Sequence, residues 1–446
     1  MSKISYSVIS KNKINSFNKT IEVDSDKSIS IRGFLISSIS QGTSELKNVL
    51  ESEDVFSTIN CLKKLGVKIK KNGKKKYIIY GRGLGSLYAK KNILLDCRNS
   101  GTLLRLLIGI LSTTPNINLK LTGDNSLKKR EMSKLLDLMS KFGASFDKNK
   151  SHLPFRLISS SMPIGINYKS GVSAQLKSAV ILAGLNSFGF TNVEESRDKL
   201  SRNHTENLLL KSKGIIKIKK NKINVVGKHS LNHLNISIPG DPSSAAFFCA
   251  ITIFTKNSKL KIKNVCLNPT RIGFYNLLKK HGANIKFKNK KKINNEIIGD
   301  VHVKSSKLKP IKAGANYYPS TTDEYVILFV CAALVPGISV FKGVADLSNK
   351  ESSRAQEMKK ILNQVGIKCK TSKNEMRIYG SKFITHTKKI IKVKNLNDHR
   401  ICMASVCLSL ISGIKCYIKN FETVNTSSPS FLKIIKSIGG KYEIRK

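Results

Sequence analysis

The stretch 136-LDLMSKFGASF-146 joins a leucine-rich helical segment to a short β-like segment through Gly143. A helix commonly ends at a residue in the left-handed conformation, which glycine adopts without a Cβ penalty. The same combination occurs five more times, at intervals of roughly 70 to 85 residues, around Gly66, Gly214, Gly282, Gly366 and Gly439. The sequence therefore predicts six similar units, each built from helices and strands.

A break in this pattern lies near the middle of the chain. Pro239, Gly240, Asp241 and Pro242 interrupt the repeat just before a new apolar helix. Three of the glycines precede this break and three follow it. A chain of 446 residues is long enough for two or three domains with cores of their own. We therefore predict two similar domains of three units each, with a substrate bound in the cleft between them.

The formal net charge is +51, from 79 Lys and Arg residues against 28 Asp and Glu residues. Such a charge raises the question of a nucleic-acid partner. The lysines are dispersed along expected turns and edge strands, and no basic helix, zinc-finger spacing or aromatic RNA-binding signature is found. The sequence therefore argues against a specific nucleic-acid partner and predicts only weak attraction of polyanions at low salt.

Nine cysteines occur without a Cys-x-x-Cys pair, and several lie in apolar runs such as 245-AAFFCAITIF-254. Buried, reduced thiols are typical of cytosolic proteins. The first residues lack the apolar core of a signal peptide, and no apolar run approaches the length of a membrane span. We therefore expect a cytoplasmic protein without membrane segments.

Short polar stretches that lead directly into apolar helices occur in both halves of the chain. Their cations are Lys27, Arg32, Arg105, Arg130, Lys177, Arg202, Lys350, Arg354 and Arg400. Their acids are fewer, namely Asp323, Glu324, Glu351 and Asp398. Arginine binds phosphate and carboxylate groups with two parallel hydrogen bonds, and helix N-termini add backbone N–H donors. The pattern indicates a site for several anionic groups, in which the isolated acids transfer protons.

Metal and nucleotide chemistry find no support in the sequence. The eight histidines are dispersed and show no metal-ligand spacing. Neither a Gly-x-x-x-x-Gly-Lys loop nor a Gly-x-Gly-x-x-Gly turn occurs, and 81-GRGLGS-86 lacks a following helix, so we interpret it as a turn. We therefore expect no metal and no cofactor.

Each polar stretch also has a purely structural interpretation. A serine near residue 28 could cap a helix beside two solvated cations, and Asp323 could cap the helix that contains 324-EYVILFV-330. Residues 350–354 could form an exposed charge pair on a helix. Residues 99–102 could simply cap the helix that follows them.

Taken together and in order, these stretches resemble the EPSP synthase family, the 3-phosphoshikimate 1-carboxyvinyltransferases, from about Ile21 to Phe431. The matching motifs are 26-DKSISIR-32, 99-NSGT-102, 173-SAQ-175, 201-SRNHTE-206, 323-DE-324, 350-KESSR-354 and 398-DHR-400. The first two are similar to the family's first substrate loop and its phosphoenolpyruvate loop. The next two resemble its shikimate 3-phosphate site, and the last three its catalytic and phosphoenolpyruvate residues in the other domain.

The resemblance implies an α/β fold of two similar domains, each of three βαβαββ repeats, which is the inside-out α/β barrel of the enolpyruvyl transferases. It implies an N-terminal lobe of residues 21–239 and a second lobe of residues 1–20 plus 240–446. The N-terminal segment would thus cross over to the second lobe.

The family's reaction moves the enolpyruvyl group of phosphoenolpyruvate to the 5-hydroxyl of shikimate 3-phosphate and releases phosphate, on the pathway to chorismate and the aromatic amino acids. The catalytic residues that the resemblance implies are Asp323, Glu351 and Lys27. Those implied for shikimate 3-phosphate are Lys27, Ser28, Arg32, Ser173, Ala174, Gln175, Arg202, Asp323 and Lys350. Those implied for phosphoenolpyruvate are Lys27, Asn99, Gly101, Thr102, Arg130, Gln175, Arg354 and Arg400. The resemblance further implies a monomer, inhibited by glyphosate at the phosphoenolpyruvate site.

The chain departs from the family pattern at Asp24, Ser25, Glu131, Ser348 and Ser353, and we expect these changes to alter loop rigidity and substrate affinity. One alternative is a UDP-N-acetylglucosamine enolpyruvyltransferase, which shares the fold and the donor. That enzyme uses a Lys-Asn pair in its first loop and a cysteine in a Pro-Gly-Gly-Cys type loop, whereas this chain has Lys27-Ser28 and no such cysteine. An inactive or nucleic-acid-binding relative of the fold is the other alternative.

Overall fold

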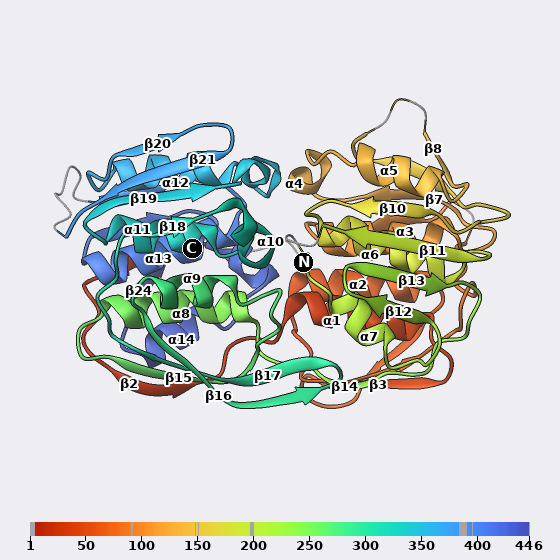
Figure 1. The fold of residues 1–446 in the computed structure, drawn as a ribbon, viewed down its shortest axis with the longest axis horizontal. Coiled ribbons are helices and arrows are strands. Elements are labelled where there is room, and N and C mark those ends of the chain that lie inside the picture. Colours follow the sequence, from red (N-terminus) through yellow and green to blue (C-terminus); the bar gives the residue numbers. More distant parts are fainter. Residues whose placement is uncertain are drawn as a thin grey trace. The chain divides into compact units, whose positions relative to one another are not determined.

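The computed structural model describes residues 5–90, 92–147, 149, 151–196, 200–382, 390–394 and 396–445. The chain divides into two compact units (Figure 1). The N-terminal unit comprises Ser25–Ile238 and Ile293–Glu296. The C-terminal unit comprises Met1–Asp24, Pro239–Lys292 and Ile297–Lys446.

The N-terminal unit contains three four-stranded sheets, with the strand orders β14-β3-β5-β4, β6-β7-β9-β8 and β10-β11-β13-β12. Their strands are β3 (Thr43–Lys47), β4 (Lys68–Lys71), β5 (Tyr77–Tyr80), β6 (Leu94–Asp96), β7 (Asn118–Thr122), β8 (Ser145–Phe146), β9 (Phe155–Ile158), β10 (Asn167–Ser170), β11 (Phe190–Glu195), β12 (Ile216–Lys219), β13 (Lys222–Val226) and β14 (Asn235–Ser237). The helices are α1 (Lys27–Ser38), α2 (Glu53–Lys64), α3 (Gly101–Ser112), α4 (Asn125–Lys128), α5 (Ser133–Ser140), α6 (Ala174–Leu185) and α7 (His204–Leu209).

The C-terminal unit repeats this plan with the strand orders β16-β17-β15-β2, β18-β19-β21-β20 and β22-β23-β1-β24. Its strands are β1 (Ser7–Lys11), β2 (Asn18–Ile21), β15 (Lys259–Cys266), β16 (Asn284–Ile293), β17 (Glu296–Lys304), β18 (Lys312–Ala313), β19 (Gly337–Lys342), β20 (Cys369–Thr371), β21 (Glu375–Gly380), β22 (Ile390–Val393), β23 (Lys415–Ile418) and β24 (Lys441–Arg445). The helices are α8 (Pro242–Phe254), α9 (Gly273–Lys280), α10 (Tyr318–Thr321), α11 (Tyr325–Ala333), α12 (Arg354–Asn363), α13 (His399–Ser412) and α14 (Phe431–Ser437), with short 3₁₀ turns η1 (Ala315–Tyr317), η2 (Ala345–Asn349) and η3 (Phe421–Thr426).

All six sheets share one pairing pattern. Each contains one parallel pair of strands, and an antiparallel strand lies beside one member of that pair. A parallel pair needs a crossover connection, which the helices supply, and antiparallel neighbours follow by shorter connections. This arrangement confirms the predicted α/β fold of two similar domains with three repeats each.

The six glycines that defined the repeat lie where the sequence pattern placed them. All of them have positive φ, between 77° at Gly366 and 103° at Gly282. The strand that follows each glycine is an edge strand of its sheet, in order β4, β8, β12, β16, β20 and β24. The prediction of six helix-glycine-strand units is therefore confirmed.

The chain passes from one unit to the other directly after β2 and again directly after β14. β2 immediately precedes α1 and β3 in sequence, yet it pairs in parallel with β15 of the C-terminal unit. β14 precedes α8 and β15, yet it pairs in parallel with β3 of the N-terminal unit. The last sheet also incorporates the N-terminal strand, because β1 lies between β23 and β24.

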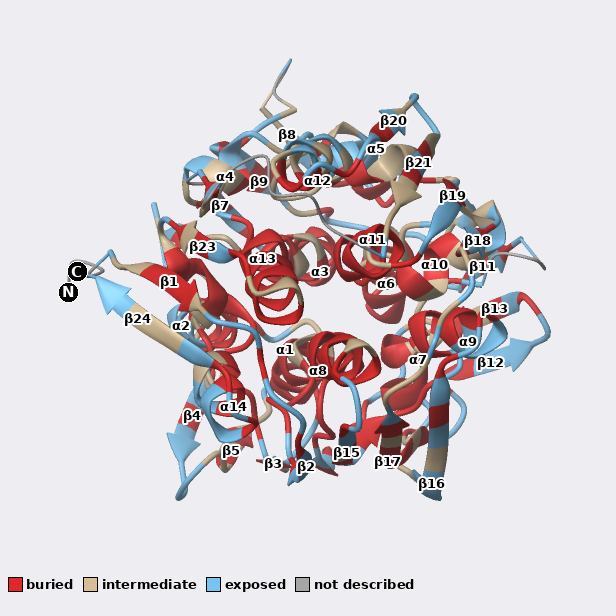
Figure 2. Ribbon diagram, turned by 90° about the vertical axis from the view of Figure 1, so that its left-hand side faces the viewer, coloured by how far each residue is buried: buried red, intermediate tan, exposed pale blue. Residues whose placement is uncertain are grey.

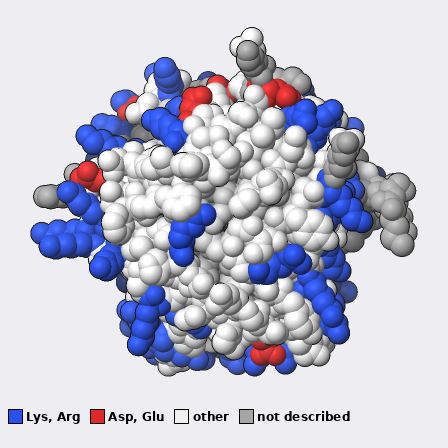
Figure 3. Space-filling model, turned by 90° about the vertical axis from the view of Figure 1, so that its right-hand side faces the viewer, with Lys and Arg blue, Asp and Glu red and all other residues white. Residues whose placement is uncertain are grey.

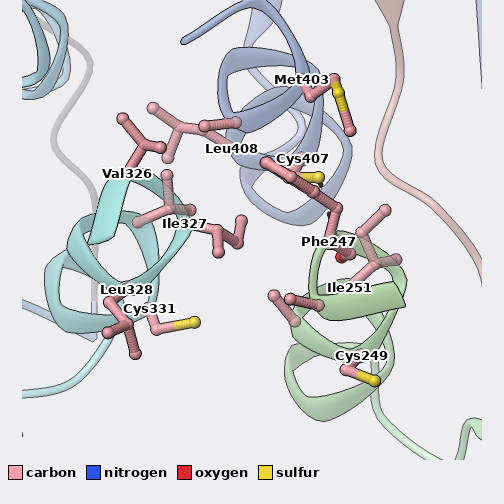
Figure 4. Close-up of a cluster of buried hydrophobic side chains, with 14 of the residues drawn as sticks. Phe247, Cys249, Ile251, Val326, Ile327, Leu328, Cys331, Met403, Cys407 and Leu408 are labelled. Atoms are coloured by element: carbon pink, nitrogen blue, oxygen red, sulfur yellow. Dashed lines mark hydrogen bonds between the residues drawn. The ribbon is translucent and has the colours of Figure 1, made fainter. Parts of the chain in front are cut away.

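Each unit buries three helices almost completely. In the N-terminal unit these are α1, α3 and α6, and in the C-terminal unit α8, α11 and α13, all largely red in Figure 2. Figure 4 shows apolar side chains of α8, α11 and α13 converging on one cluster, among them Phe247, Ile327 and Leu408. Each such side chain contributes about 1.5–3 kcal/mol when fully buried. A helix that is apolar on most sides needs this enclosure, because it has no face to offer to water.

The cysteines contribute to these cores as free thiols. All nine are buried and none is in a disulfide. Burial raises the pKa of the Cys249 and Cys331 thiols, and it raises the pKa of Cys369 to about 12. A thiol that resists ionisation is a poor nucleophile, so these cysteines act as small apolar side chains.

Figure 3 shows the Lys and Arg side chains on one face of the molecule. On that face Lys and Arg lie mostly toward the margin and are separated by uncharged surface. Within the described part of the chain, no helix combines the length and the apolar character that crossing a membrane would require.

Helices α3 and α6 cross at Gly109, where a Cβ atom would lie 2.5 Å from the carbonyl oxygen of Ala179 and 2.8 Å from its Cα. Alanine is a better helix former than glycine by about 1 kcal/mol. The clash is with backbone, however, and backbone in a packed helix pair cannot move aside cheaply.

We expect Gly109→Ala to lower the free energy of unfolding by about 1–3 kcal/mol despite the higher helix propensity of alanine. Denaturant unfolding followed by circular dichroism measures this change. The control is Gly171→Ala, because a Cβ at Gly171 meets no atom within 4 Å. Equal stability of the two variants would mean that the helices do not approach this closely at Gly109.

Candidate functional site

The first polar stretch, residues 24–32, begins helix α1, and its cap is Asp26. The Asp26 side chain accepts a hydrogen bond from the Ile29 amide at 2.8 Å, so the interpretation of a serine cap is wrong. Lys27, the first helical residue, forms an ion pair with Asp54 at 2.9 Å. Asp26 satisfies an orphan N–H and compensates the helix dipole. Lys27 is thus not a freely solvated cation, since its ammonium is largely buried against Asp54.

Arg32 lies one turn further along α1 and is almost fully buried, with 3% of its surface exposed. Its Nε donates to Thr205 Oγ1 at 2.8 Å, and its second terminal nitrogen donates to Ser178 Oγ at 3.1 Å. A third donor reaches the backbone carbonyl of Ser28 at 3.2 Å. Two hydroxyls and a backbone carbonyl orient this guanidinium, and an oriented guanidinium suits an anion site.

The start of α3 carries a second set of the predicted residues. Ser100 caps the helix by accepting from the Leu103 amide, and Asn99 accepts from Arg130 at 2.7 Å. Gln175, from α6, accepts from Arg105 at 2.8 Å and donates to Thr102 Oγ1 at 3.0 Å. The structure thus brings Asn99, Thr102, Arg130 and Gln175 together, with Arg105 as an additional cation. Capping of α3 and anion binding are compatible here, because different residues do each.

Gly101, the first residue of α3, lies directly under these guanidiniums. A Cβ at Gly101 would be 2.7 Å from a terminal nitrogen of Arg105 and 2.8 Å from one of Arg130. Glycine therefore leaves the space in which the two arginines come close to the helix N-terminus.

The start of α6 carries Ser173, which caps the helix, and Ala174, its first residue. Arg202 lies in the loop before α7 and is half-buried. Lys177 was one of the cations assigned to substrate, and the structure corrects this. It is fully buried and forms ion pairs with Glu195 at 2.9 Å and Glu206 at 2.6 Å. Glu206 lies on α7 within the motif 201-SRNHTE-206, whereas no sequence signal pointed to Glu195, because a glutamate ending a strand usually faces solvent.

In the C-terminal unit the predicted acids converge on Arg354. This guanidinium is 1% exposed and contacts Asp398 at 3.0 Å, Glu351 at 2.6 Å and Asp323 at 3.6 Å. Burial opposes its charge, but the three carboxylates outweigh burial and raise the pKa of Arg354 above its ordinary value. The acids are therefore not isolated, and residues 350–354 are not an exposed charge pair.

Asp323 and Arg400 complete this cluster. Asp323 contacts the Arg400 Nε at 3.4 Å, and its side chain is 21% exposed. Asp398 caps α13 by accepting from the Arg400 amide at 3.0 Å. The N-cap residue of α11 is Glu324, so the interpretation of Asp323 as that cap is wrong. Glu324 is fully buried and accepts a hydrogen bond from Ser243, which gives it a structural rather than a proton-transfer environment.

Lys350 is held by a separate contact. Its ammonium lies 2.6 Å from Asp346, which also accepts a hydrogen bond from the Tyr318 hydroxyl at 2.8 Å. Burial would raise the pKa of Asp346, but the charge and hydrogen bond of Lys350 outweigh burial, so this pKa lies below its ordinary value. Burial and the neighbouring Asp346 raise the pKa of Tyr318.

The residues that depart from the family pattern differ in their burial and in the hydrogen bonds that they make. Asp24 is buried and accepts hydrogen bonds from Ser428 Oγ at 3.0 Å and the Ser430 amide at 2.9 Å. Ser25 is also buried. Glu131 accepts from Ser133 on the surface, Ser348 donates to the Ala345 carbonyl, and Ser353 is the N-cap residue of α12 without a side-chain cap bond. Asp24 thus gains specific partners of its own.

The two units carry different chemistry. The N-terminal unit brings Arg32 to hydroxyls near the beginning of α1, and Arg105 and Arg130 to amide oxygens near the beginning of α3, which suits several anionic groups. The C-terminal unit presents carboxylates around two arginines, which suits proton transfer near an anion. The six βαβαββ repeats and these residues define a class of two-domain α/β protein in which one domain suits anion binding and the other proton transfer.

Comparisons with known proteins identify the family within that class. The family model for EPSP synthase (3-phosphoshikimate 1-carboxyvinyltransferase) matches residues 11–435. The chain is 37% identical over 425 residues to the 3-phosphoshikimate 1-carboxyvinyltransferase of Petrotoga mobilis, covering 94% of this chain and 97% of that protein. It is 35% identical over 419 residues to the Clostridium tetani protein of the same name, covering 94% of each.

A solved EPSP synthase structure from Acinetobacter baumannii superposes with a TM-score of 0.85 at 32% identity, covering 99% of this chain and 100% of that one. The chain therefore belongs to the EPSP synthase family. It is a transferase of the shikimate pathway.

We expect Gly101→Ala to raise the KM for phosphoenolpyruvate about tenfold, because the new methyl group must push the ends of Arg105 and Arg130 out of place. These ends are flexible, so the melting temperature should change little. Glyphosate, which is longer than phosphoenolpyruvate, should lose inhibition by a larger factor. Initial rates at varied phosphoenolpyruvate and glyphosate measure both effects, and unchanged values would exclude Gly101 from the donor site.

Proposed function

We propose that this enzyme transfers the enolpyruvyl group of phosphoenolpyruvate to the 5-hydroxyl of shikimate 3-phosphate, with substrate binding and proton transfer divided between the two units. The observation that carries the proposal is that arginines gather near helix starts in one unit and carboxylates gather around Arg354 in the other. The substrates bring two phosphates and two carboxylates, and in the N-terminal unit hydroxyl, carbonyl and amide oxygens accept hydrogen bonds from Arg32 and Arg130 and orient them.

The N-terminal unit binds the anionic groups in this proposal. Ser28, Arg32, Ser173, Ala174, Gln175 and Arg202 bind shikimate 3-phosphate together with Lys350. Lys27, Asn99, Gly101, Thr102, Arg130 and Gln175 bind phosphoenolpyruvate together with Arg354 and Arg400. The hydroxyl and carbonyl supports of Arg32, and the Asn99 support of Arg130, set the direction of each guanidinium before substrate arrives. Such preorganisation lowers the ordering cost of binding.

Two carboxylates of the C-terminal unit, together with Lys27 of the N-terminal unit, move the protons in this proposal. Asp323 takes the proton of the 5-hydroxyl as that oxygen attacks the donor carbon, and Glu351 with Lys27 delivers a proton to the methylene carbon. This addition gives a tetrahedral intermediate. Loss of a methyl proton to the same groups and departure of phosphate then restore the double bond. Arg354 and Arg400 lie 3.6 Å and 3.4 Å from the Asp323 carboxylate and orient it.

We also propose that the enzyme acts as a cytoplasmic monomer without metal, cofactor or specific nucleic-acid partner. The nine free, buried cysteines support a reducing compartment. The dispersed lysines support non-specific attraction only.

The proposed function is tested by phosphate release from phosphoenolpyruvate. We expect release only when shikimate 3-phosphate is present, with 5-enolpyruvylshikimate 3-phosphate as the second product by mass spectrometry. UDP-N-acetylglucosamine is the control acceptor, because the related transferase uses it. Phosphate release with UDP-N-acetylglucosamine, or with neither acceptor, would overturn the proposal.

We expect Asp323→Asn to lower kcat by about a hundredfold or more, the scale of a lost general base. The melting temperature should change little, because Asp323 caps no helix and its closest described cation contact is 3.4 Å long. The control is Asp300→Asn on β17, which removes another ion-paired carboxylate of the same unit, 3.1 Å from Lys261. Near-normal turnover of Asp323→Asn would assign the base to another residue.

A further inference from the structure

We infer that Lys177 is a positioning residue for the shikimate 3-phosphate site, through which the α7 region holds Arg32 and Arg202 in place. The inference deepens the proposed function and rests on it. Lys177 itself is fully buried, so it does not act by touching substrate. Its effect passes through Glu195 and Glu206, two acids outside the set of residues already assigned.

The first step of the argument is the charge balance. The Lys177 ammonium lies 2.9 Å from a Glu195 oxygen and 2.6 Å from a Glu206 oxygen, and all three side chains are at most 7% exposed. Neither Glu206 oxygen accepts a hydrogen bond of good geometry within the described part of the chain. The ammonium is therefore the group that compensates the Glu206 carboxylate, and its removal leaves buried charge unpaired.

The second step concerns the loop that carries Arg202. The other Glu195 oxygen accepts two hydrogen bonds from Ser201, one from its amide and one from its hydroxyl, both at 2.8 Å. Lys177 also donates to the Ser201 carbonyl at 3.4 Å. Ser201 immediately precedes Arg202, so the Lys177–Glu195 pair fixes the backbone from which Arg202 projects.

The third step concerns Arg32. Thr205, the neighbour of Glu206 on α7, accepts from Arg32 and donates to Ser178 at 2.8 Å. Ser178, the neighbour of Lys177 on α6, accepts from Arg32 as well. Consecutive residues on both helices therefore serve two adjoining contacts: Lys177 with Glu206, and Ser178 with Thr205. The ion pair sets the distance between α6 and α7 on which the Arg32 contacts depend.

A second set of contacts holds α7 in place when the ion pairs of Lys177 are lost. Glu296 lies 2.7 Å from His204 Nδ1 and accepts from Asn207 at 3.0 Å. Loss of Lys177 should thus shift α7 and its preceding loop without unfolding the N-terminal unit, which makes the effect measurable as substrate affinity.

The experiment measures shikimate 3-phosphate affinity in Lys177→Met, which keeps the length of the side chain and removes its charge. We expect the KM for shikimate 3-phosphate to rise about tenfold to a hundredfold, the scale of a site displaced by a fraction of an ångström to one ångström. The KM for phosphoenolpyruvate, and kcat at saturating shikimate 3-phosphate, should change less than about threefold. Lys177→Arg, which keeps the charge, should recover most of the affinity.

The matched control is Leu46→Ala, which removes a fully buried side chain of β3 in the same unit and destabilises that unit without removing a contact of this cluster. It should lower the melting temperature and leave both KM values unchanged. Ser201→Ala keeps the ion pairs but removes one bond to Glu195, so it is a milder variant that folds if Lys177→Met does not. It should raise the KM for shikimate 3-phosphate and not that for phosphoenolpyruvate.

Calorimetric binding of shikimate 3-phosphate without phosphoenolpyruvate separates this inference from the proposed function. Absence of turnover in the unmodified enzyme would overturn the proposed function alone. Calorimetry would still measure how Lys177→Met changes the affinity for shikimate 3-phosphate. Unchanged shikimate 3-phosphate affinity in folded Lys177→Met and Ser201→Ala would overturn the positioning role. The positioning role would also be overturned if Lys177→Met raised both KM values equally, or if Leu46→Ala raised the KM for shikimate 3-phosphate as much as Lys177→Met does.

Discussion

Six helices with almost no face for water impose the main constraint on this structure. A helix such as α11, whose nine residues are all buried, must be enclosed on every side. Two neighbouring helices cover only part of its circumference, so each unit surrounds three such helices with three sheets. The repeat serves this enclosure, because each repeat supplies helices together with a sheet that shields them.

Because these helices are enclosed, only their ends are accessible, and the polar side chains described above lie near those ends. Backbone N–H groups at a helix N-terminus need acceptors, and the chain caps them with short side chains such as Asp26, Ser100 and Ser173. Residues one turn further along then carry the guanidiniums. The N-terminal unit supports these guanidiniums with hydroxyls and amides, whereas the C-terminal unit surrounds Arg354 with carboxylates. In the proposed function, the same end of the repeat serves as an anion site in one unit and as an acid–base site in the other.

The sequence predicted the repeat well, because a left-handed glycine after a helix is a local requirement that a short stretch reveals. It also identified residues that the structure links, such as Asn99 with Arg130 and Thr102 with Gln175. The sequence could not show which side chains pair with each other when they lie far apart in the chain. Lys177 looked like one more substrate cation, because its partners Glu195 and Glu206 lie 18 and 29 positions away, on other elements. Serine seemed the natural cap of α1, yet Asp26 compensates the helix dipole better because it is charged.

The pairing of β14 with β3 and of β2 with β15 also determines the order in which the sheets can form during synthesis. The N-terminal unit is almost one continuous segment, so its three sheets can form as soon as β14 leaves the ribosome. β1 and β2 are made first, yet β2 finds its partner only when β15 is made, and Ser7 pairs with Arg445 at the far end of the chain. β2 therefore keeps an unpaired edge until β15 is made, and β1 does so while nearly the whole polypeptide is translated. A nascent chain of this kind exposes strand edges longest at its own beginning, which is where a chaperone would have the most time to act.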